Sequence, residues 1–160
     1  MATRDLVSSA EKTARRQLRA YISVVNGDIE LVNGGNGIRA QVRIKNFGQT
    51  PAYETSAWAV VRVLEAETTG FSMDKGEKPA VRSVMGPSAE TVLARLDRTS
   101  HDDLASIADG TKRIFVWGRV EYIDAFDRRR WFVFHHRNTR TFEAPGRWGV
   151  EPYGEGEQGN

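Results

Sequence analysis

A strict alternation of apolar and polar residues over positions 38–45 constrains this chain more than any other feature. A period of two residues is typical of a β-strand with one buried face and one solvated face. The segment therefore predicts a half-buried strand and an arginine- and lysine-bearing outer surface. The apolar members are Ile38, Ala40, Val42 and Ile44, and the polar members are Arg39, Gln41, Arg43 and Lys45.

A compact turn motif, Asn-Phe-Gly-Gln-Thr-Pro at 46–51, ends this strand and precedes the apolar run 57–64. We interpret Asn46, Gly48, Thr50 and Pro51 as a structural turn. Asn46 can bond local backbone groups, Gly48 supplies conformational freedom and Pro51 restricts φ. Because the strand over 53–65 has apolar residues on both faces, we expect it to be central or covered by another element.

Further strand signals recur along the chain, and few helices separate them. They predict a mainly β, antiparallel sandwich of seven or eight strands with one short inserted helix at 100–110. Asn26-Gly27 predicts a two-residue turn, residues 66–80 a long loop, and Asp124–Asp127 a hairpin connection. The predicted strands cover 20–25, 28–32, 38–46, 53–65, 88–96, 113–123 and 129–138.

The two ends differ from this β-rich middle. Residues 1–19 carry a thin apolar stripe at helical spacing and basic residues elsewhere, which predicts an amphipathic or stalk helix. Residues 20–142 form the predicted sandwich domain. Residues 143–160 are rich in glycine and proline, and we expect partial disorder there from about Tyr153 onward.

Charge composition gives little support to nucleic-acid binding. The 160 residues include 23 Lys and Arg against 21 Asp and Glu, a formal net charge of only +2. Nucleic-acid binding would require the basic clusters to share one face, and the middle cluster is better explained as the solvated face of a strand. The clusters are Lys12/Arg15/Arg16/Arg19, Arg39/Arg43/Lys45 and Arg128/Arg129/Arg130.

Catalytic machinery is not evident in the sequence. There is no cysteine and there are only three histidines, and His135 and His136 should point to opposite faces of one strand. We therefore predict no catalytic residue, no metal ligand and no cofactor. The alternative that stays open is a small-ligand-binding protein or hydrolase that uses Asp102, Asp124 and a histidine.

The predicted hairpin around 124–131 combines aromatic and basic side chains. We interpret the chain's other aromatic residues mainly as core and cross-strand pairs. The hairpin is the best candidate for an interaction face. That face consists of Phe126, Arg128, Arg129, Arg130 and Trp131.

Three motifs in order are similar to those of a group of small bacterial proteins of unknown function. They are Gln17-Leu-Arg-Ala-Tyr21, Ile44-Lys-Asn-Phe-Gly-Gln-Thr-Pro-Ala-Tyr53 and Trp117-Gly-x-x-x-Tyr122-x-Asp124-x-Phe126. In that group, membrane helices precede a basic helix and an immunoglobulin-like β-sandwich. The resemblance covers residues 12–140 and implies this fold and no catalytic residues. Asp127 stands where the resemblance leads us to expect glycine.

These observations favour a non-enzymatic binding or interaction module with a protein partner. A membrane surface, contacted through the N-terminal helix, is a second possible partner, and nucleic acid is not favoured. No stretch reaches the ~18 apolar residues of a membrane span, so we expect a soluble chain, whereas the resemblance implies membrane tethering.

Overall fold

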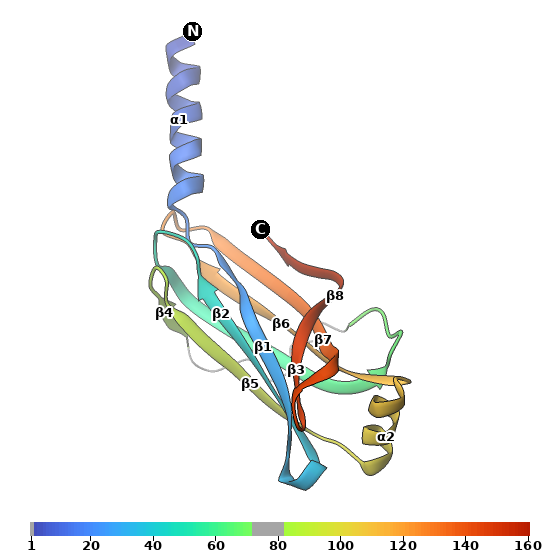
Figure 1. Cartoon of the computed structure of the whole chain (residues 1–160). Helices are drawn as coiled ribbons and strands as arrows, with labels where there is room; N and C mark the ends of the chain where they lie inside the picture. Colours follow the sequence, from blue (N-terminus) through green and yellow to red (C-terminus); the bar gives the residue numbers. More distant parts are fainter. Residues whose placement is uncertain (1, 72–81) are drawn as a thin grey trace.

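The computed structural model describes residues 2–71 and 82–160 (Figure 1). Two helices, a short 3₁₀ turn and eight strands follow one another along the chain. In order they are α1 (Ala2–Leu18), β1 (Ile22–Val32), η1 (Asn33–Gly35), β2 (Gly37–Asn46), β3 (Ala52–Glu65), β4 (Ser83–Met85), β5 (Glu90–Arg98), α2 (His101–Asp109), β6 (Lys112–Ile123), β7 (Arg129–Ala144) and β8 (Arg147–Gly159).

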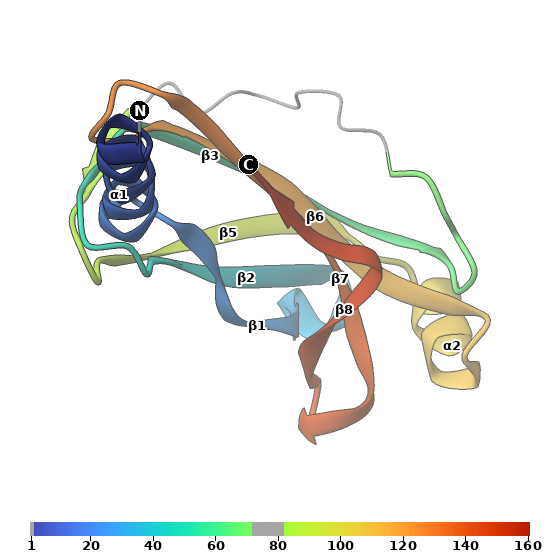
Figure 2. The same ribbon diagram turned by 90° about the horizontal axis from the view of Figure 1, so that it is seen from above.

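The strands form an antiparallel β-sandwich whose two layers are visible end-on in Figure 2. One layer has the order β4-β3-β6-β7, the other has the order β1-β2-β5, and β8 joins them by pairing with both β7 and β1. An immunoglobulin domain likewise divides its strands between two antiparallel sheets. The predicted mainly β, antiparallel fold with an N-terminal helix and one short inserted helix is confirmed.

The main core lies between these layers, and the alternation in β2 supplies much of it. Ile38, Ala40, Val42 and Ile44 are all at most 1% exposed, whereas the intervening polar residues reach solvent. Burying each of the larger aliphatic side chains stabilises the fold by about 1.5–3 kcal/mol. The alternation over 38–45 therefore predicts both the strand and its buried face correctly.

A second apolar cluster covers the outer face of β3 and β6. It consists of Trp58, Phe115 and Trp117, against which Phe71 and Tyr153 pack. The ring of Phe71 lies 5.3 Å from that of Phe115 and 5.0 Å from that of Trp117. The prediction that another element covers the strand over 53–65 is thus correct.

The short inserted helix is confirmed as α2, and its ends follow from local chemistry. Ser100 accepts a hydrogen bond from the backbone N–H of Asp103, whose carboxylate accepts one from the N–H of Ser100. This reciprocal capping box satisfies two backbone donors at the first turn. Gly110 ends the helix with φ of 86°.

Two local predictions are wrong. Asn26-Gly27 does not form a turn: β1 runs continuously, and the pair lies at a register shift between Val24 and Asn26. The C-terminal tail, where we expect disorder from about Tyr153 onward, forms strand β8, whose residues Glu157, Gln158 and Gly159 pair with β7. Gly154 and Gly156, with φ of 65° and 66°, lie where the register of β8 on β7 shifts between Pro152 and Glu157.

The remaining differences concern the connections. The predicted loop at 66–80 is irregular over 66–71, and positions 72–80 lie outside the described residues. The short strand β4, which pairs with β3, was not predicted. Asp127 adopts a positive φ of 59°, the conformation in which glycine is normally favoured.

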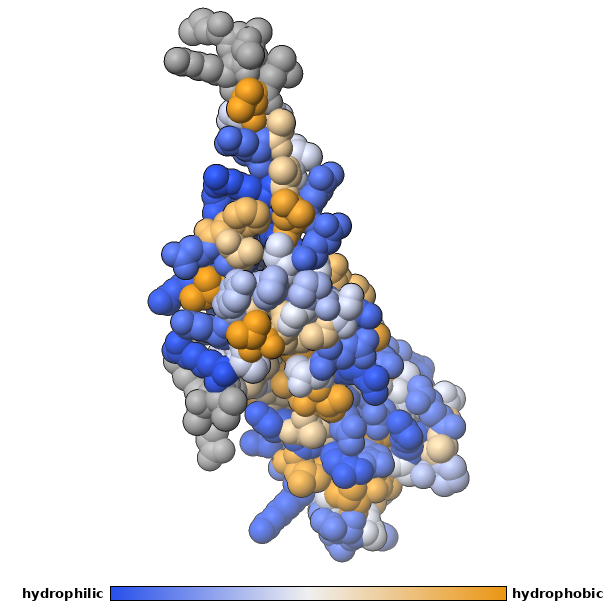
Figure 3. All heavy atoms as spheres, turned by 90° about the vertical axis from the view of Figure 1, so that its left-hand side faces the viewer, coloured by the Kyte–Doolittle hydropathy of each residue, from blue (hydrophilic) through white to orange (hydrophobic). Residues whose placement is uncertain are grey.

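Helix α1 confirms the predicted N-terminal helix and extends from one end of the sandwich (Figure 1). Residues 7–18 are all exposed, Val7 to 55% and Leu18 to 43%. Figure 3 shows apolar and charged side chains on different parts of this helix. Among the described residues, neither helix has the length and apolar character needed to cross a membrane.

Candidate functional site

The β6–β7 turn is organised by the buried carboxylate of Asp124. It accepts hydrogen bonds from the backbone N–H groups of Phe126 (2.9 Å) and Arg128 (3.0 Å) and from Nε of Arg130 (2.9 Å). Burial by itself would raise the pKa of Asp124. The hydrogen bonds from Arg130 and the two N–H groups outweigh burial and hold this pKa below its ordinary value. The turn therefore presents Phe126 and Arg128 on a fixed support.

The base of α1 is held by the predicted structural turn at 46–51. The buried Asn46 side chain accepts from the N–H groups of Tyr21 (3.1 Å) and Gly48 (2.9 Å) through Oδ1. Its Nδ2 donates to the carbonyl oxygens of Thr50 (2.9 Å) and Met85 (3.1 Å). Asn46 thus connects the segment after α1 to two loops.

Gly48 acts through close approach, which corrects the predicted role of conformational freedom. A Cβ at position 48 would overlap the carbonyl oxygen of Arg19 and lie 2.6 Å from Cα of Ala20. On the other side, the Tyr122 hydroxyl donates to the carbonyl oxygen of Ala20 over 3.3 Å. The chain leaving α1 is therefore held between the 46–51 turn and β6.

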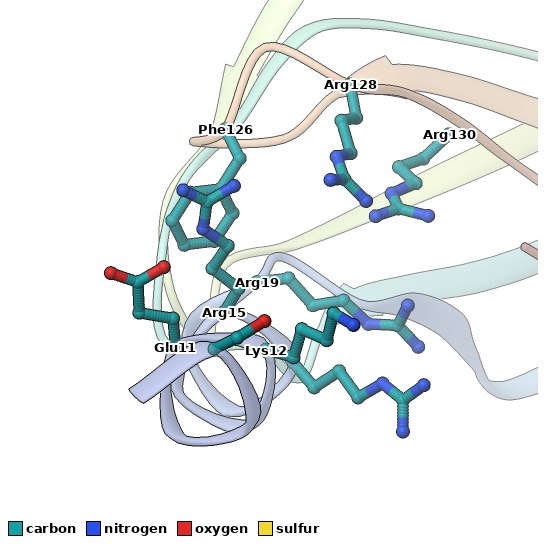
Figure 4. Close-up of a pocket in the computed structure, with 9 residues that line it drawn as sticks. Glu11, Lys12, Arg15, Arg19, Phe126, Arg128 and Arg130 are labelled. Carbon is teal, nitrogen blue, oxygen red and sulfur yellow. The ribbon is translucent and has the colours of Figure 1, made fainter. Parts of the chain in front are cut away.

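A cleft of about 500 Å³ separates α1 from the β6–β7 turn. In Figure 4, Arg128 and Arg130 point from the turn toward the helix, and Arg15 reaches up to the Phe126 ring. The Arg15 guanidinium carbon lies 5.7 Å from the centre of that ring. The cleft is lined by Ser8, Glu11, Lys12, Arg15, Arg16, Arg19, Phe126, Arg128 and Arg130.

The charge of this cleft is strongly one-sided, since six of its nine lining residues are Lys or Arg and one is acidic. Arg130 is paired with Asp124. Among the side chains that the structure describes, at 7–71, 82–154 and 156–160, the other five cations have no ion-pair partner. We name this site, defined by the nine lining residues, the cationic cleft. Its chemistry suits an anionic ligand.

Two of the three predicted basic clusters therefore meet, and the third does not. On β2, Arg39 pairs with Glu30, Arg43 with Glu90 (3.4 Å), and Lys45 with the same glutamate (3.2 Å). These acids neutralise much of the middle cluster. The interpretation of that cluster as a solvated strand face agrees with this arrangement.

The predicted interaction face is split between two surfaces. Phe126, Arg128 and Arg130 line the cationic cleft, whereas Arg129 and Trp131 line a separate hollow on β3, β6 and β7, which Arg130 also borders. There the Arg119 guanidinium lies 5.1 Å from the centre of the Trp131 ring.

The residues of the hydrolase alternative are not brought together. Asp102 lies on α2 before β6, and Asp124 follows the far end of β6. Twelve residues of strand span roughly 40 Å, which is too far for the two carboxylates to act on one bond. His101, at the start of α2, is exposed.

His135 and His136 face opposite sides of β7, as predicted. His136 is buried, with Nε2 3.6 Å from a carboxylate oxygen of Glu157. His135 stacks on Phe71, and its Nδ1 lies 3.3 Å from the carbonyl oxygen of Gly156. Among the described side chains, neither histidine contacts two carboxylates. In the described part of the chain, no group of three His, Cys, Asp or Glu residues is placed to hold a metal ion.

Sequence reasoning missed the α1 contribution to the site. The cations at 12, 15, 16 and 19 recur at helical spacing, and this signal could have identified a basic helical face. The turn that faces them lies more than a hundred residues away, and only the tertiary structure shows that contact.

Comparison of the chain with protein-family models, curated proteins and solved structures finds no match. The function therefore has to be argued from the geometry of the cationic cleft.

Proposed function

We propose that this protein is a non-enzymatic interaction module that binds an anionic partner in the cationic cleft. The observation that carries the proposal is the meeting of two basic clusters, one on α1 and one on the β6–β7 turn, with a single carboxylate, Glu11, among the lining residues. Opposite charge brought into a cleft of this kind is attracted more strongly than at an open surface.

The supports of the cleft are built into the fold, which favours a binding site over a chance charge cluster. Asp124 holds the turn, while Asn46 and Gly48 hold the base of α1. Both walls of the cleft are thus fixed at their bases by buried side chains or close backbone contacts. A preorganised site loses less conformational entropy when a ligand binds.

Retention on a heparin column, measured as the salt concentration at elution, tests this proposal. The double variant Arg16→Gln/Arg128→Gln removes one cation from each wall. The matched control Arg98→Gln/Arg140→Gln removes two exposed cations from elsewhere. We expect the cleft variant to elute at clearly lower salt and the control to elute near the parent protein. Equal shifts for both variants, or no shift for either, would overturn the proposal.

A second candidate partner is an anionic membrane surface, contacted through α1. The specific observation in its favour is the exposure of Val7 and Leu18 on this basic helix, since amphipathic basic helices bind such surfaces. Flotation with vesicles of phosphatidylcholine and phosphatidylglycerol tests it. Val7→Gln/Leu18→Gln should abolish flotation, and unchanged flotation would remove the apolar residues from this role.

A further inference from the structure

The shape of the cationic cleft restricts what it can hold. On the α1 wall, Lys12, Arg16 and Arg19 follow one another at intervals of four and three residues, so they share one side of the helix. At 1.5 Å per residue, the row is about 10 Å long. Arg128 and Arg130 face this row from the opposite wall (Figure 4). A ligand must therefore be narrow and elongated to contact both walls.

An extended peptide has a spacing that suits this row. Alternate side chains of an extended chain lie about 6.6 Å apart on one side, so carboxylates at two or three alternate positions would match a row about 10 Å long. Five of the six lining cations are arginines. Their planar guanidinium groups bind carboxylates through paired hydrogen bonds, which lysine cannot do.

The two ends of the cleft differ in chemistry. In Figure 4, Glu11, Phe126 and the Arg15 guanidinium lie together at one end, while Arg128, Arg130 and Arg19 lie toward the other. Glu11 repels an acidic residue at its end, and Phe126 offers an apolar contact there. The cleft thus selects a segment whose acidic residues lie at the arginine end and whose apolar residue lies beside Phe126.

Two other ligand classes fit this geometry less well. Single-stranded nucleic acid is normally held by several aromatic side chains on which successive bases stack. Among the described residues that line the cleft, Phe126 alone is aromatic, so successive bases would have a single ring to stack on. A flat lipid surface cannot enter between two walls. Peptide carboxylates satisfy both the width and the charge of the site.

We infer that the occupant of the cationic cleft is an extended acidic segment of a partner protein, with acidic residues at alternate positions. This inference rests on the proposed function, because it names the partner class of the same cleft. It predicts that the cleft recognises carboxylates at alternate positions of a peptide. General attraction to polyanions would not require that spacing.

Fluorescence anisotropy with a dye-labelled peptide, Phe-Gly-Glu-Gly-Glu-Gly-Glu, tests the inference at moderate salt. Its matched control has glutamine in place of each glutamate. We expect measurable binding of the glutamate peptide and at least a tenfold weaker affinity for the glutamine peptide. Arg16→Gln or Arg128→Gln should weaken peptide binding roughly tenfold, about the effect of one charge-assisted hydrogen bond. Arg98→Gln should leave it unchanged.

The variant Glu11→Gln gives a test of opposite sign. Loss of Glu11, the one carboxylate among the described lining residues, should strengthen binding of Phe-Gly-Glu-Gly-Glu-Gly-Glu and of the reversed peptide Glu-Gly-Glu-Gly-Glu-Gly-Phe alike, by roughly twofold at a partly screened site. Thermal unfolding of each variant checks that the fold is retained. Since these side chains line an open cleft, the melting temperatures should stay close to that of the parent.

Specific outcomes overturn the inference and leave the proposed function standing. If heparin retention depends on Arg16 and Arg128 but the acidic peptide does not bind, the cleft accepts an anion of another class. If a thymidine oligonucleotide or anionic vesicles bind more tightly than the acidic peptide, and this binding depends on Arg16 and Arg128, the cleft likewise accepts an anion of another class. If neither heparin nor peptide depends on the cleft, both proposals fail.

Discussion

Arg95 of β5 donates a hydrogen bond from Nε to the backbone carbonyl oxygen of Ala59 in β3, over 3.0 Å. These two strands belong to different layers and are not neighbours in the sheet order. A second connection, the 3.0 Å ion pair between Arg62 and Asp97, joins the same strands. The two contacts close the side of the sandwich opposite β8. An inward-pointing charge also protects an edge strand from pairing with another chain.

The variant Arg95→Gln should lower the free energy of unfolding by about 1 kcal/mol, because the side chain can no longer reach Ala59. Arg98→Gln removes an exposed arginine from the same strand and should change stability by less than about 0.5 kcal/mol. Urea unfolding followed by tryptophan fluorescence measures both. Equal stability of the two variants would show that the Arg95 hydrogen bond does not stabilise the sandwich.

Asn46→Ala should be among the most destabilising polar substitutions in this chain, at about 3 kcal/mol. It would leave the N–H groups of Tyr21 and Gly48 and the carbonyl oxygens of Thr50 and Met85 without their partner. Asn26→Ala, at an exposed position, is the control and should be nearly neutral. Calorimetry gives both melting temperatures. A loss of less than 1 kcal/mol for Asn46→Ala would contradict the role assigned to this side chain.

Gly48→Ala should destabilise the protein by about 1–3 kcal/mol, because a methyl group there meets the backbone of Arg19 and Ala20. Gly86→Ala is the control and should change stability little, since a Cβ at position 86 meets no atom within 4 Å. We also expect Gly48→Ala to disturb the base of α1. Amide chemical shifts of Arg19, Ala20 and Tyr21 report that change, and unaltered shifts would mean that the contact is not made in solution.

Asp124→Asn should reduce stability at neutral pH by about 2 kcal/mol, because Arg130 loses its buried partner. The folded-state pKa of Asp124 lies below its unfolded value, so the charged form stabilises the fold. This contribution is complete above about pH 4, the ordinary pKa of aspartate. It is lost as the pH falls through the folded-state pKa.

The difference in unfolding free energy between parent and Asp124→Asn should therefore be constant from pH 5 to 7 and narrow below about pH 4. Asp102→Asn serves as the control, since Asp102 is exposed and lies far from the turn. Urea titrations at a series of pH values measure this difference. If the difference in unfolding free energy stayed constant down to pH 2, or became larger in acid, the pKa of Asp124 would not be lowered by folding.

Local patterns predicted those elements whose chemistry is complete within a short segment. The alternation over 38–45 gave β2 and its buried face, and Ser100 with Gly110 gave both ends of α2. Patterns misled where a distant partner decides the outcome. Asn26-Gly27 has the composition of a turn, yet pairing with β2 continues β1 through it.

The C-terminal strand is a second case in which distant partners decide the structure. Its glycine-rich composition predicts disorder, because such a chain buries too little apolar surface by itself. In the folded protein, β7 and β1 supply backbone partners, and the core supplies a site for Trp148. The conformational entropy lost on ordering is offset by contacts that no local pattern encodes.

By itself, the sequence determined the β-rich class, the buried face of β2, the amphipathic helix at the N-terminus and the basic character of the 128–130 turn. Each depends on residues a few positions apart, where strand or helix periodicity dictates which side chains share a face. Only the tertiary structure decided that the basic face of α1 lies against that turn. Strands β1–β6 separate Lys12 from Arg128 in sequence, and the packing of Gly48 and Tyr122 around Ala20 directs one toward the other.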